Sequence, residues 1–236
     1  MNAGLRRSAV EFLIVSSLQL GVTPVVKYTA LSIFVERFLP SIKNNNRSLR
    51  KKHGDNWLLQ PLRQCNLQLL ALVSVWVSSK IHDTRPLSVQ SLKSLGDVAI
   101  KEQHYTTRDF LEAEVVLLQV LDFEIGASNV AYVFLEDFLI RLRKLARVGD
   151  LVKLEACMDI MDVLYETEET SVLYNSPDFL AAAILVASYV ITVPKQEHEF
   201  PLLSWVKFVS SFKEEDTFEL VRTILQHVLK QTTQET

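Results

Sequence analysis

Cysteine and glycine are both scarce in this chain of 236 residues, which has two cysteines and six glycines. Cys65 and Cys157 are too few for the disulfide framework of a small secreted domain, and they favour a reducing setting inside the cell. The isolated glycines form no glycine-rich phosphate loop, and the five histidines lack the spacing of a metal site. The sequence therefore predicts no catalytic residues, no metal site and no cofactor.

Long hydrophobic runs and an excess of one charge are also missing. The longest apolar run covers residues 179–193, and its 15 residues are fewer than the roughly 20 that cross a bilayer, so we interpret it as a buried helix. The net charge is −3, so no global field attracts nucleic acid or an anionic membrane. We expect no nucleic-acid partner and no membrane partner.

Apolar residues recur mostly at the i, i+3, i+4 spacing of a helix, and no segment alternates as a half-buried strand would. The fold is therefore predicted to be all-α. The sequence indicates where two helices begin. Thr106 followed by Asp109 is a capping-box pattern, and Ser176 is expected to cap a helix that has Pro177 in its first turn. The predicted helices cover residues 5–20, 24–39, 67–82, 88–100, 107–123, 129–146, 150–171, 177–192, 200–212 and 216–231.

The order of the predicted helices repeats in the two halves of the chain. The stretch FLEAEVVLLQVL from Phe110 matches FELVRTILQHVL from Phe218, and LALVSVWVS from Leu70 matches LAAAILVAS from Leu180. The second pair is apolar nearly all round, as expected for a helix buried on every side. We predict two tandem five-helix domains, residues 1–128 and 129–236, each around a buried central helix.

One segment, residues 43–66, lacks this pattern. It is polar and basic, and it contains Gly54 and Pro61, so it is predicted to be a long connection, which is unusual inside a compact domain. Its basic residues are compatible with a localisation signal or a phosphate-binding patch. The simpler interpretation, which we favour, is a solvated loop.

Two charged residues fall on the apolar sides of their predicted helices. At about 100° per residue, Ser74 and Ser78 lie close together, whereas Lys80 lies on the opposite, apolar side of the 67–82 helix. Glu114 likewise projects with the apolar residues of the 107–123 helix. We expect the serines to face water and Lys80 to pair with Glu114, because an isolated buried charge costs several kcal/mol.

Two interpretations of this pair remain open at this stage. It is either a buried ionic cluster that fixes helix register, together with Arg7 and Glu36, or part of a functional surface. The second half offers no equivalent pair, because its matching positions hold Val190 and Arg222. Whatever the pair does, it belongs to the first half alone.

Four stretches in this order resemble the cyclin box: YTALSIFVERFLP, LLALVSVWVSSKIHDTRPLSV, HYTTRDFLEAEVVLLQVLDFEI and AYVFLEDFL. The stretch SPDFLAAAILVASYVI resembles the C-terminal cyclin fold, so the resemblance spans nearly the whole chain, and it is strongest to the small plant J-type branch. The residues typical of the cyclin box map to Arg7, Glu36, Leu69, Lys80 and Glu114, with Glu36 in place of the family's aspartate. Of these, Arg7, Glu36 and Leu69 are expected in a buried cluster.

The resemblance implies a regulatory subunit that binds and activates a cyclin-dependent serine/threonine protein kinase in cell-cycle control, as a heterodimer. In cyclins, the residues that match Lys80 and Glu114 face the kinase and hydrogen-bond backbone near its αC helix. Apolar residues beside them accommodate an isoleucine of that helix. Here these residues are Val77, Ile81, Leu118 and Ile125.

Many cell-cycle cyclins also bind RxL peptides in a groove formed by an MRAIL motif and a following tryptophan. The aligned stretch here is RRSAV, with Leu13 at the tryptophan position. A smaller groove that carries the positive charge of Arg6 predicts weak or absent binding of cationic RxL peptides. The groove residues implied by the resemblance are Arg6, Ala9, Val10, Leu13 and Gln68.

A second departure from the family is KIHD at residues 80–83, where many cyclins have KFEE. Ile81 narrows the isoleucine pocket, and we expect His82 to be an exposed loop residue without a partner, so the kinase itself is not specified. Two other classes remain as alternatives: a cyclin-fold scaffold that activates no kinase, and a general transcription factor of the TFIIB type, which the acidic pI and absence of CxxC disfavour. The resemblance implies a location in the nucleus, the cytoplasm or both.

Overall fold

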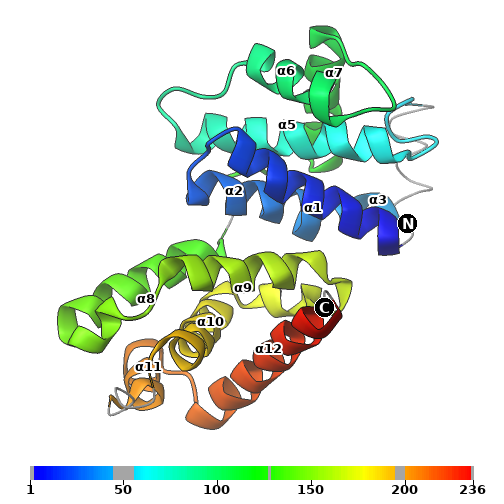
Figure 1. Ribbon diagram of the computed structural model, residues 1–236. Coiled ribbons are helices and arrows are strands. Elements are labelled where there is room, and N and C mark those ends of the chain that lie inside the picture. Colours follow the sequence, from blue (N-terminus) through cyan, green and yellow to red (C-terminus); the bar gives the residue numbers. More distant parts are fainter. Residues whose placement is uncertain (1–2, 45–55, 127–128, 195–199, 235–236) are drawn as a thin grey trace. The chain divides into compact units, whose positions relative to one another are not determined.

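The computed structural model describes residues 3–44, 56–126, 129–194 and 200–234 (Figure 1). These ranges are helical apart from short connections and contain no strand, which confirms the all-α prediction. The chain divides into two compact units, Met1–Ser128 and Asn129–Thr236. Each unit has its own apolar core, built around one central helix.

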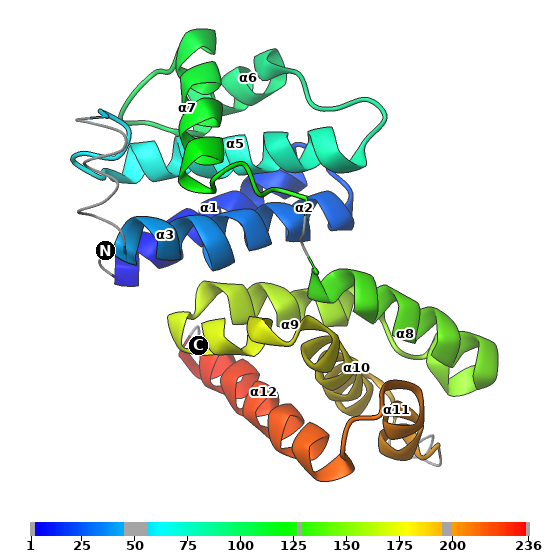
Figure 2. The same cartoon turned by 180° about the vertical axis from the view of Figure 1, so that it is seen from behind.

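In the first unit, the central helix is α5 (Gln64–His82). On one side it packs against α1 (Ala3–Gln19) and α2 (Pro24–Leu31), and on the other against α6 (Val89–Ala99) and α7 (Thr107–Val120) (Figures 1 and 2). Helix α2 runs on through the π-helical turn η1 (Ser32–Phe38) into α3 (Leu39–Asn44). Every residue of α5 from Leu69 to Ser79 is buried, as expected for a helix that is apolar on nearly all sides.

In the second unit, α10 (Pro177–Thr192) is central, and it packs against α8 (Ala131–Leu145), α9 (Leu154–Glu166), α11 (Leu202–Ser210) and α12 (Glu214–Gln234). Two 3₁₀ turns, η2 (Arg147–Asp150) and η3 (Glu168–Asn175), join its helices. Every residue of α10 from Leu180 to Tyr189 is buried in this unit. In the described ranges no single helix is long and apolar enough to cross a membrane, and η3 and α10, which together reach that length, meet at 115°.

Most helix bounds agree with the periodicity, and the exceptions have local causes. The predicted helix over residues 150–171 is instead α9 followed by η3. The capping box before α7 is formed, because the Thr106 N–H donates to Asp109 Oδ2 (2.7 Å) and the Asp109 N–H donates to Thr106 Oγ1 (3.3 Å). The Ser176 side chain makes no capping bond at α10, although Pro177 does occupy the first turn.

The connection over residues 43–66 is not a fully solvated loop, and that prediction is wrong for residues 56–66. Leu58 is fully buried, and the Trp57 indole N–H donates to Glu112 of α7 (2.9 Å). The Asn66 amide on α5 donates to the carbonyls of both Trp57 (3.0 Å) and Leu58 (3.1 Å), so this segment is tied to the core. The basic stretch RSLRKKH lies outside the described residues.

Candidate functional site

Lys80, near the end of α5, and Glu114, in the middle of α7, form the expected ion pair. The Lys80 Nζ lies 2.5 Å from Glu114 Oε1, and the two side chains are 38% and 17% exposed. The same ammonium lies 3.5 Å from the centroid of the Trp76 ring, and the Trp76 indole N–H donates to the Leu87 carbonyl (2.9 Å). The pair therefore bridges two helices at the surface and rests on a fixed aromatic ring.

The orientation of α5 is the reverse of the one expected from its polar residues. Ser74 and Ser78 are fully buried, whereas Lys80 is exposed. The Ser74 hydroxyl donates to the Leu70 carbonyl of its own helix (2.9 Å), and the Ser78 hydroxyl donates to the Val26 carbonyl of α2 (2.7 Å). A serine that bonds to a backbone carbonyl needs no water, so these small side chains face the neighbouring helix. The pair is thus not a buried ionic cluster.

Apolar side chains lie beside the pair. Ile81 is 40% exposed and Leu118 is half-buried, whereas Val77 is buried beneath them. On α7, the exposed residues Leu111 and Val115 share an arc of the helix surface with Leu118 and Glu114, because residues three and four apart are neighbours on a helix. Three of the four predicted pocket residues, Ile81, Leu118 and Ile125, therefore reach the surface to some extent, and Val77 does not.

An exposed aromatic residue follows the end of α7, and the sequence prediction missed it. Phe123 is 65% exposed, and both Asp122 (φ 50°) and Phe123 (φ 61°) adopt the left-handed conformation. This conformation is uncommon outside glycine, and it turns the chain sharply before Ile125. Its side chain points to solvent because the turn separates it from the buried face of α7. Hydrophobic periodicity predicted a helix through residue 123 and therefore gave no signal for this position.

The residues expected in a buried cluster divide between core and surface. Leu69 is fully buried and Glu36 is half-buried, but Arg7 is exposed, and its Nε lies 2.7 Å from Glu11 one turn along α1. Arg6 is the buried arginine of α1, with 5% of its surface exposed. The expected burial of Arg7 is therefore wrong.

The residues expected to line a peptide groove on α1 do not lie at its surface, and the weak or absent binding of RxL peptides stays a prediction. Besides Arg6, residues Ala9, Val10 and Leu13 are fully buried on the inner face of α1, so none of the four lines an open groove. Gln68 is half-buried. The outer face instead presents Leu5, Ser8, Phe12 and Val15, and the Gln64 amide donates to the Ser8 hydroxyl (3.0 Å). Because Arg6 is buried, its charge is not placed to repel a cationic peptide at the surface of α1.

His82 is not a loop residue without a partner. It is the last residue of α5, and its Nε2 lies 2.9 Å from the hydroxyl oxygen of Thr29 on α2. The prediction that it lacks a partner is wrong. The hydrogen bond joins the end of α5 to α2, directly beside Ile81 and Lys80.

The second unit has no counterpart of the pair. Val190, at the position of Lys80, is an exposed apolar residue, and Arg222, at the position of Glu114, lies 4.0 Å from Glu219 of its own helix. Within the described ranges, no group of three His, Cys, Asp or Glu side chains is placed to hold a metal ion.

Comparison with known proteins gives concordant matches. The family model "Cyclin, N-terminal domain" matches residues 1–126. Over 225 residues the chain is 56% identical to Cyclin-J18 of Arabidopsis thaliana, covering 95% of each chain. It is 50% identical to Cyclin-J18-like of Oryza sativa subsp. japonica over 228 residues, covering 95% of this chain and 87% of the relative.

A solved structure, that of a viral cyclin from herpesvirus saimiri, has a similar fold. The TM-score is 0.68, and the match covers 97% of this chain and 86% of the viral protein. Sequence identity is 18%, so this likeness concerns the fold alone. The predicted fold of two tandem cyclin-like domains is confirmed by it.

Proposed function

This chain belongs to the cyclin family, whose members are regulatory proteins and not enzymes, and from this premise we propose that it binds and activates a cyclin-dependent serine/threonine protein kinase. We propose that Lys80 and Glu114 hydrogen-bond backbone groups near the αC helix of the kinase. Ile81, Leu118 and Ile125 then contact apolar side chains of the same helix. The observation that carries the proposal is the exposed Lys80–Glu114 pair with apolar residues beside it.

The pair retains hydrogen-bonding capacity toward a partner. An ammonium has three N–H donors, and Lys80 directs one of them to Glu114 Oε1. A carboxylate has two oxygens, so Glu114 can accept an N–H from a partner at its second oxygen while it keeps Lys80 in place. Together the two side chains offer a donor and an acceptor at fixed positions, which suits the exposed backbone groups at the end of a helix.

The apolar side chains supply the energy for shifting a conformational equilibrium. A protein kinase is active when its αC glutamate pairs with the β3 lysine that holds the ATP phosphates. A regulatory subunit that contacts the αC helix only in this position raises the population of the active state, because a ligand stabilises the state that it binds better. Exposed Leu111 and Val115 extend the available apolar surface along α7.

The test measures binding and activation with a panel of purified PSTAIRE-type and related kinases. We expect the wild-type chain to bind one of them and to stimulate phosphorylation of a histone-derived peptide. Lys80→Ala or Glu114→Ala should weaken binding by about 2 kcal/mol or more, roughly 30-fold in Kd, because each leaves a charge unpaired in the interface. Thermal melting should change little, because partly exposed pairs contribute about 0–1 kcal/mol to stability.

Lys93 and Asp97 of α6 provide a matched control in the same unit. Their ion pair also measures 2.5 Å, with side chains 31% and 32% exposed. Lys93→Ala and Asp97→Ala should leave both Kd and activation unchanged. If they weaken binding as much as the Lys80 and Glu114 substitutions do, the proposed contact surface is wrong. A wild-type chain that binds a kinase without stimulating it would be a scaffold.

We also propose that the protein acts inside the cell, in the nucleus, the cytoplasm or both. Both cysteines are buried and unpaired, which suits a reducing compartment. Imaging of the full chain fused to a fluorescent protein tests this location, and a secreted or vesicular signal would contradict it.

A further inference from the structure

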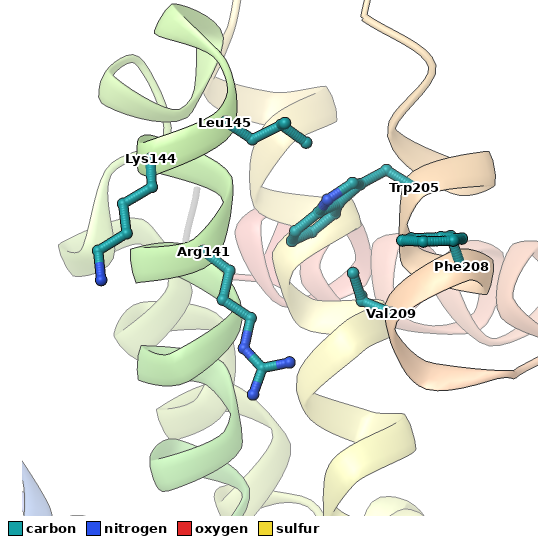
Figure 3. A pocket seen from close by; sticks show the side chains of 6 residues that line it. All are labelled: Arg141, Lys144, Leu145, Trp205, Phe208 and Val209. Atoms are coloured by element: carbon teal, nitrogen blue, oxygen red, sulfur yellow. The ribbon is translucent and has the colours of Figure 1, made fainter.

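The second unit has an open groove between α8 and α11, and it shares no residue with the proposed kinase contact, whose residues belong to the first unit. Its volume is about 420 Å³. One wall consists of Arg141, Lys144 and Leu145 of α8, and the other of Trp205, Phe208 and Val209 of α11. Figure 3 shows Leu145 directed toward Trp205 and Arg141 extending on the groove side of α8, whereas Lys144 extends on the other side of that helix.

The apolar part of this groove is unusually exposed. Trp205 is 9% exposed and forms the floor, but Phe208 is 85% exposed and Leu145 is 60% exposed. Helix α11 already buries Leu202, Trp205 and Val206 in the core, so Phe208 is not needed to hold the helix in place. Leu145 of α8 and Phe208 of α11 thus lie on opposite walls of the groove, and another large apolar side chain can enter between them.

The charged residues that line the groove are both cations, although one of them is paired with a nearby carboxylate. Its lining contains two cations and no carboxylate. The Arg141 guanidinium reaches back to Asp137 (2.7 Å), one turn earlier on α8, in a pair that is about half exposed on both sides. Lys144 forms no ion pair with any described residue. Arg143, between them, turns away and donates to the carbonyls of Gly149 and Val152.

We propose that this groove binds a short acidic segment of a partner protein, with a large apolar side chain inserted between α8 and α11. The apolar side chain would contact Trp205, Phe208 and Leu145. Carboxylates of the same segment would bind Arg141, whose planar guanidinium matches carboxylate geometry, and Lys144 at the rim. Two cations on a chain of net charge −3 are too few to attract nucleic acid, so a peptide fits better than a polynucleotide.

This inference does not depend on kinase activation, because all of its residues lie in the second unit. It gives the chain a recognition site for an acidic protein segment that is separate from the Lys80–Glu114 pair. The two sites are therefore testable one at a time, and loss of peptide binding need not affect kinase binding.

The experiment selects 12-residue peptides from a randomised phage-displayed library on the full chain. Enriched sequences should combine one aromatic or large aliphatic residue with two or more Asp or Glu residues. A synthetic peptide of the strongest sequence is then titrated against variants by fluorescence polarisation. We expect Kd to rise at least tenfold with Arg141→Glu and with Phe208→Ser, and to rise further at higher salt.

Two substitutions on α12 serve as matched controls. Arg222→Glu reverses an exposed arginine in the same unit, and Leu229→Ser removes an exposed apolar side chain, 67% exposed. Both should change Kd less than twofold. Melting curves establish that each variant is folded, which is expected because all four side chains lie on the surface.

Trp205 reports directly on the groove. The chain has three tryptophans, and the other two, Trp57 and Trp76, belong to the first unit. In the full chain labelled with 5-fluorotryptophan, the ¹⁹F resonance of Trp205 should shift on addition of the peptide while the other two stay in place. A shift confined to Trp57 or Trp76 would overturn the proposal.

Three other results would also overturn it: enrichment of basic or uncharged peptides, no peptide sensitive to Phe208→Ser, or self-association of the chain that Phe208→Ser abolishes. The last result would show that a second copy occupies the groove. Sedimentation velocity of the wild-type chain and of the variant distinguishes it from peptide binding.

Discussion

Asn66 is the residue on which the docking of residues 56–63 against α5 depends. It is 2% exposed, and its amide donates to the carbonyls of Trp57 (3.0 Å) and Leu58 (3.1 Å). Its Oδ1 accepts the hydroxyl of Tyr105, 3.1 Å away. Asn66→Ala removes these three hydrogen bonds and a longer one from the Cys65 thiol to Oδ1 (3.6 Å), and it leaves two carbonyls and the Tyr105 hydroxyl without these partners.

The expected cost follows from these three bonds. At about 1 kcal/mol net for each, the free energy of unfolding should fall by about 3 kcal/mol, a large share of the total stability of an ordinary domain. For a unit of this size the melting temperature should fall by about 10 °C. Asn66→Asp should cost at least as much at neutral pH, because it directs a carboxylate at two carbonyl oxygens.

Urea unfolding, followed by tryptophan fluorescence, measures this cost, and amide exchange shows where it arises. Exchange should accelerate first at Trp57 and Leu58, because their anchors are lost before α5 itself opens. Gln68→Ala, on the same helix and half-buried, should change stability by less than about 0.5 kcal/mol. The reasoning is wrong if Asn66→Ala costs less than about 1 kcal/mol, or if residues 56–63 keep their protection.

Two further predictions concern the arginines of α1, whose burial differs from the sequence prediction, and the buried Cys157, to which the sequence assigned no role. Arg6→Ala should lower the free energy of unfolding by about 3 kcal/mol or more in urea, because it leaves the groups that interact with the buried guanidinium without their partner. Arg7→Ala should lower it by less than about 0.5 kcal/mol, because it removes only an exposed i,i+4 pair, and equal losses would contradict the assignment. Burial raises the pKa of the Cys157 thiol from 9.0 to about 11. Because the pKa of this thiol is higher in the folded state than in the unfolded state, the neutral thiol contributes its full stability below pH 9. The free energy of unfolding then falls by roughly 2–3 kcal/mol as the pH rises toward 11. The urea midpoint should change more between pH 8 and pH 10.5 for the wild type than for Cys157→Ala. The same change in both proteins would contradict this prediction.

Most helices were predictable because their apolar residues recur at helical spacing. The two central helices were predictable because they are apolar on nearly all sides. Helix α10 has the predicted bounds, since Pro177 defines its start and the helix ends at Thr192, one residue before the end of its apolar run. Helix α1 is different: apolar residues occur at almost every angle around it, so the pattern does not choose between Arg6 and Arg7 as the buried residue. Only packing against α5 makes this choice, and that contact is not visible in the spacing.

The errors at the site have a similar origin. Treating serine as a residue that faces water ignores its ability to bond a carbonyl of its own or a neighbouring helix, as Ser74 and Ser78 do. The docking of Trp57 and Leu58 needs partners on α5 and α7 that are distant in sequence. By contrast, the Lys80–Glu114 pair was predicted correctly although its expected burial was wrong, because the two opposite charges lie on neighbouring helices.

The surroundings of an ion pair, more than its length, determine whether a partner can use it. Lys93–Asp97 and Lys80–Glu114 have the same 2.5 Å separation, and in water each contributes about 1 kcal/mol at most. Lys93 and Asp97 belong to one helix, and Asp97 also lies 3.4 Å from the exposed imidazole of His104. Lys80 and Glu114 join two helices over an aromatic ring, with Ile81, Val115 and Leu118 beside them. An apolar partner surface that covers these side chains also removes water from the pair, and a desolvated pair held in place by two helices interacts more strongly than a hydrated one. For this reason the Lys80 and Glu114 substitutions should act on partner binding far more than on folding, whereas the Lys93 and Asp97 substitutions should act weakly on both.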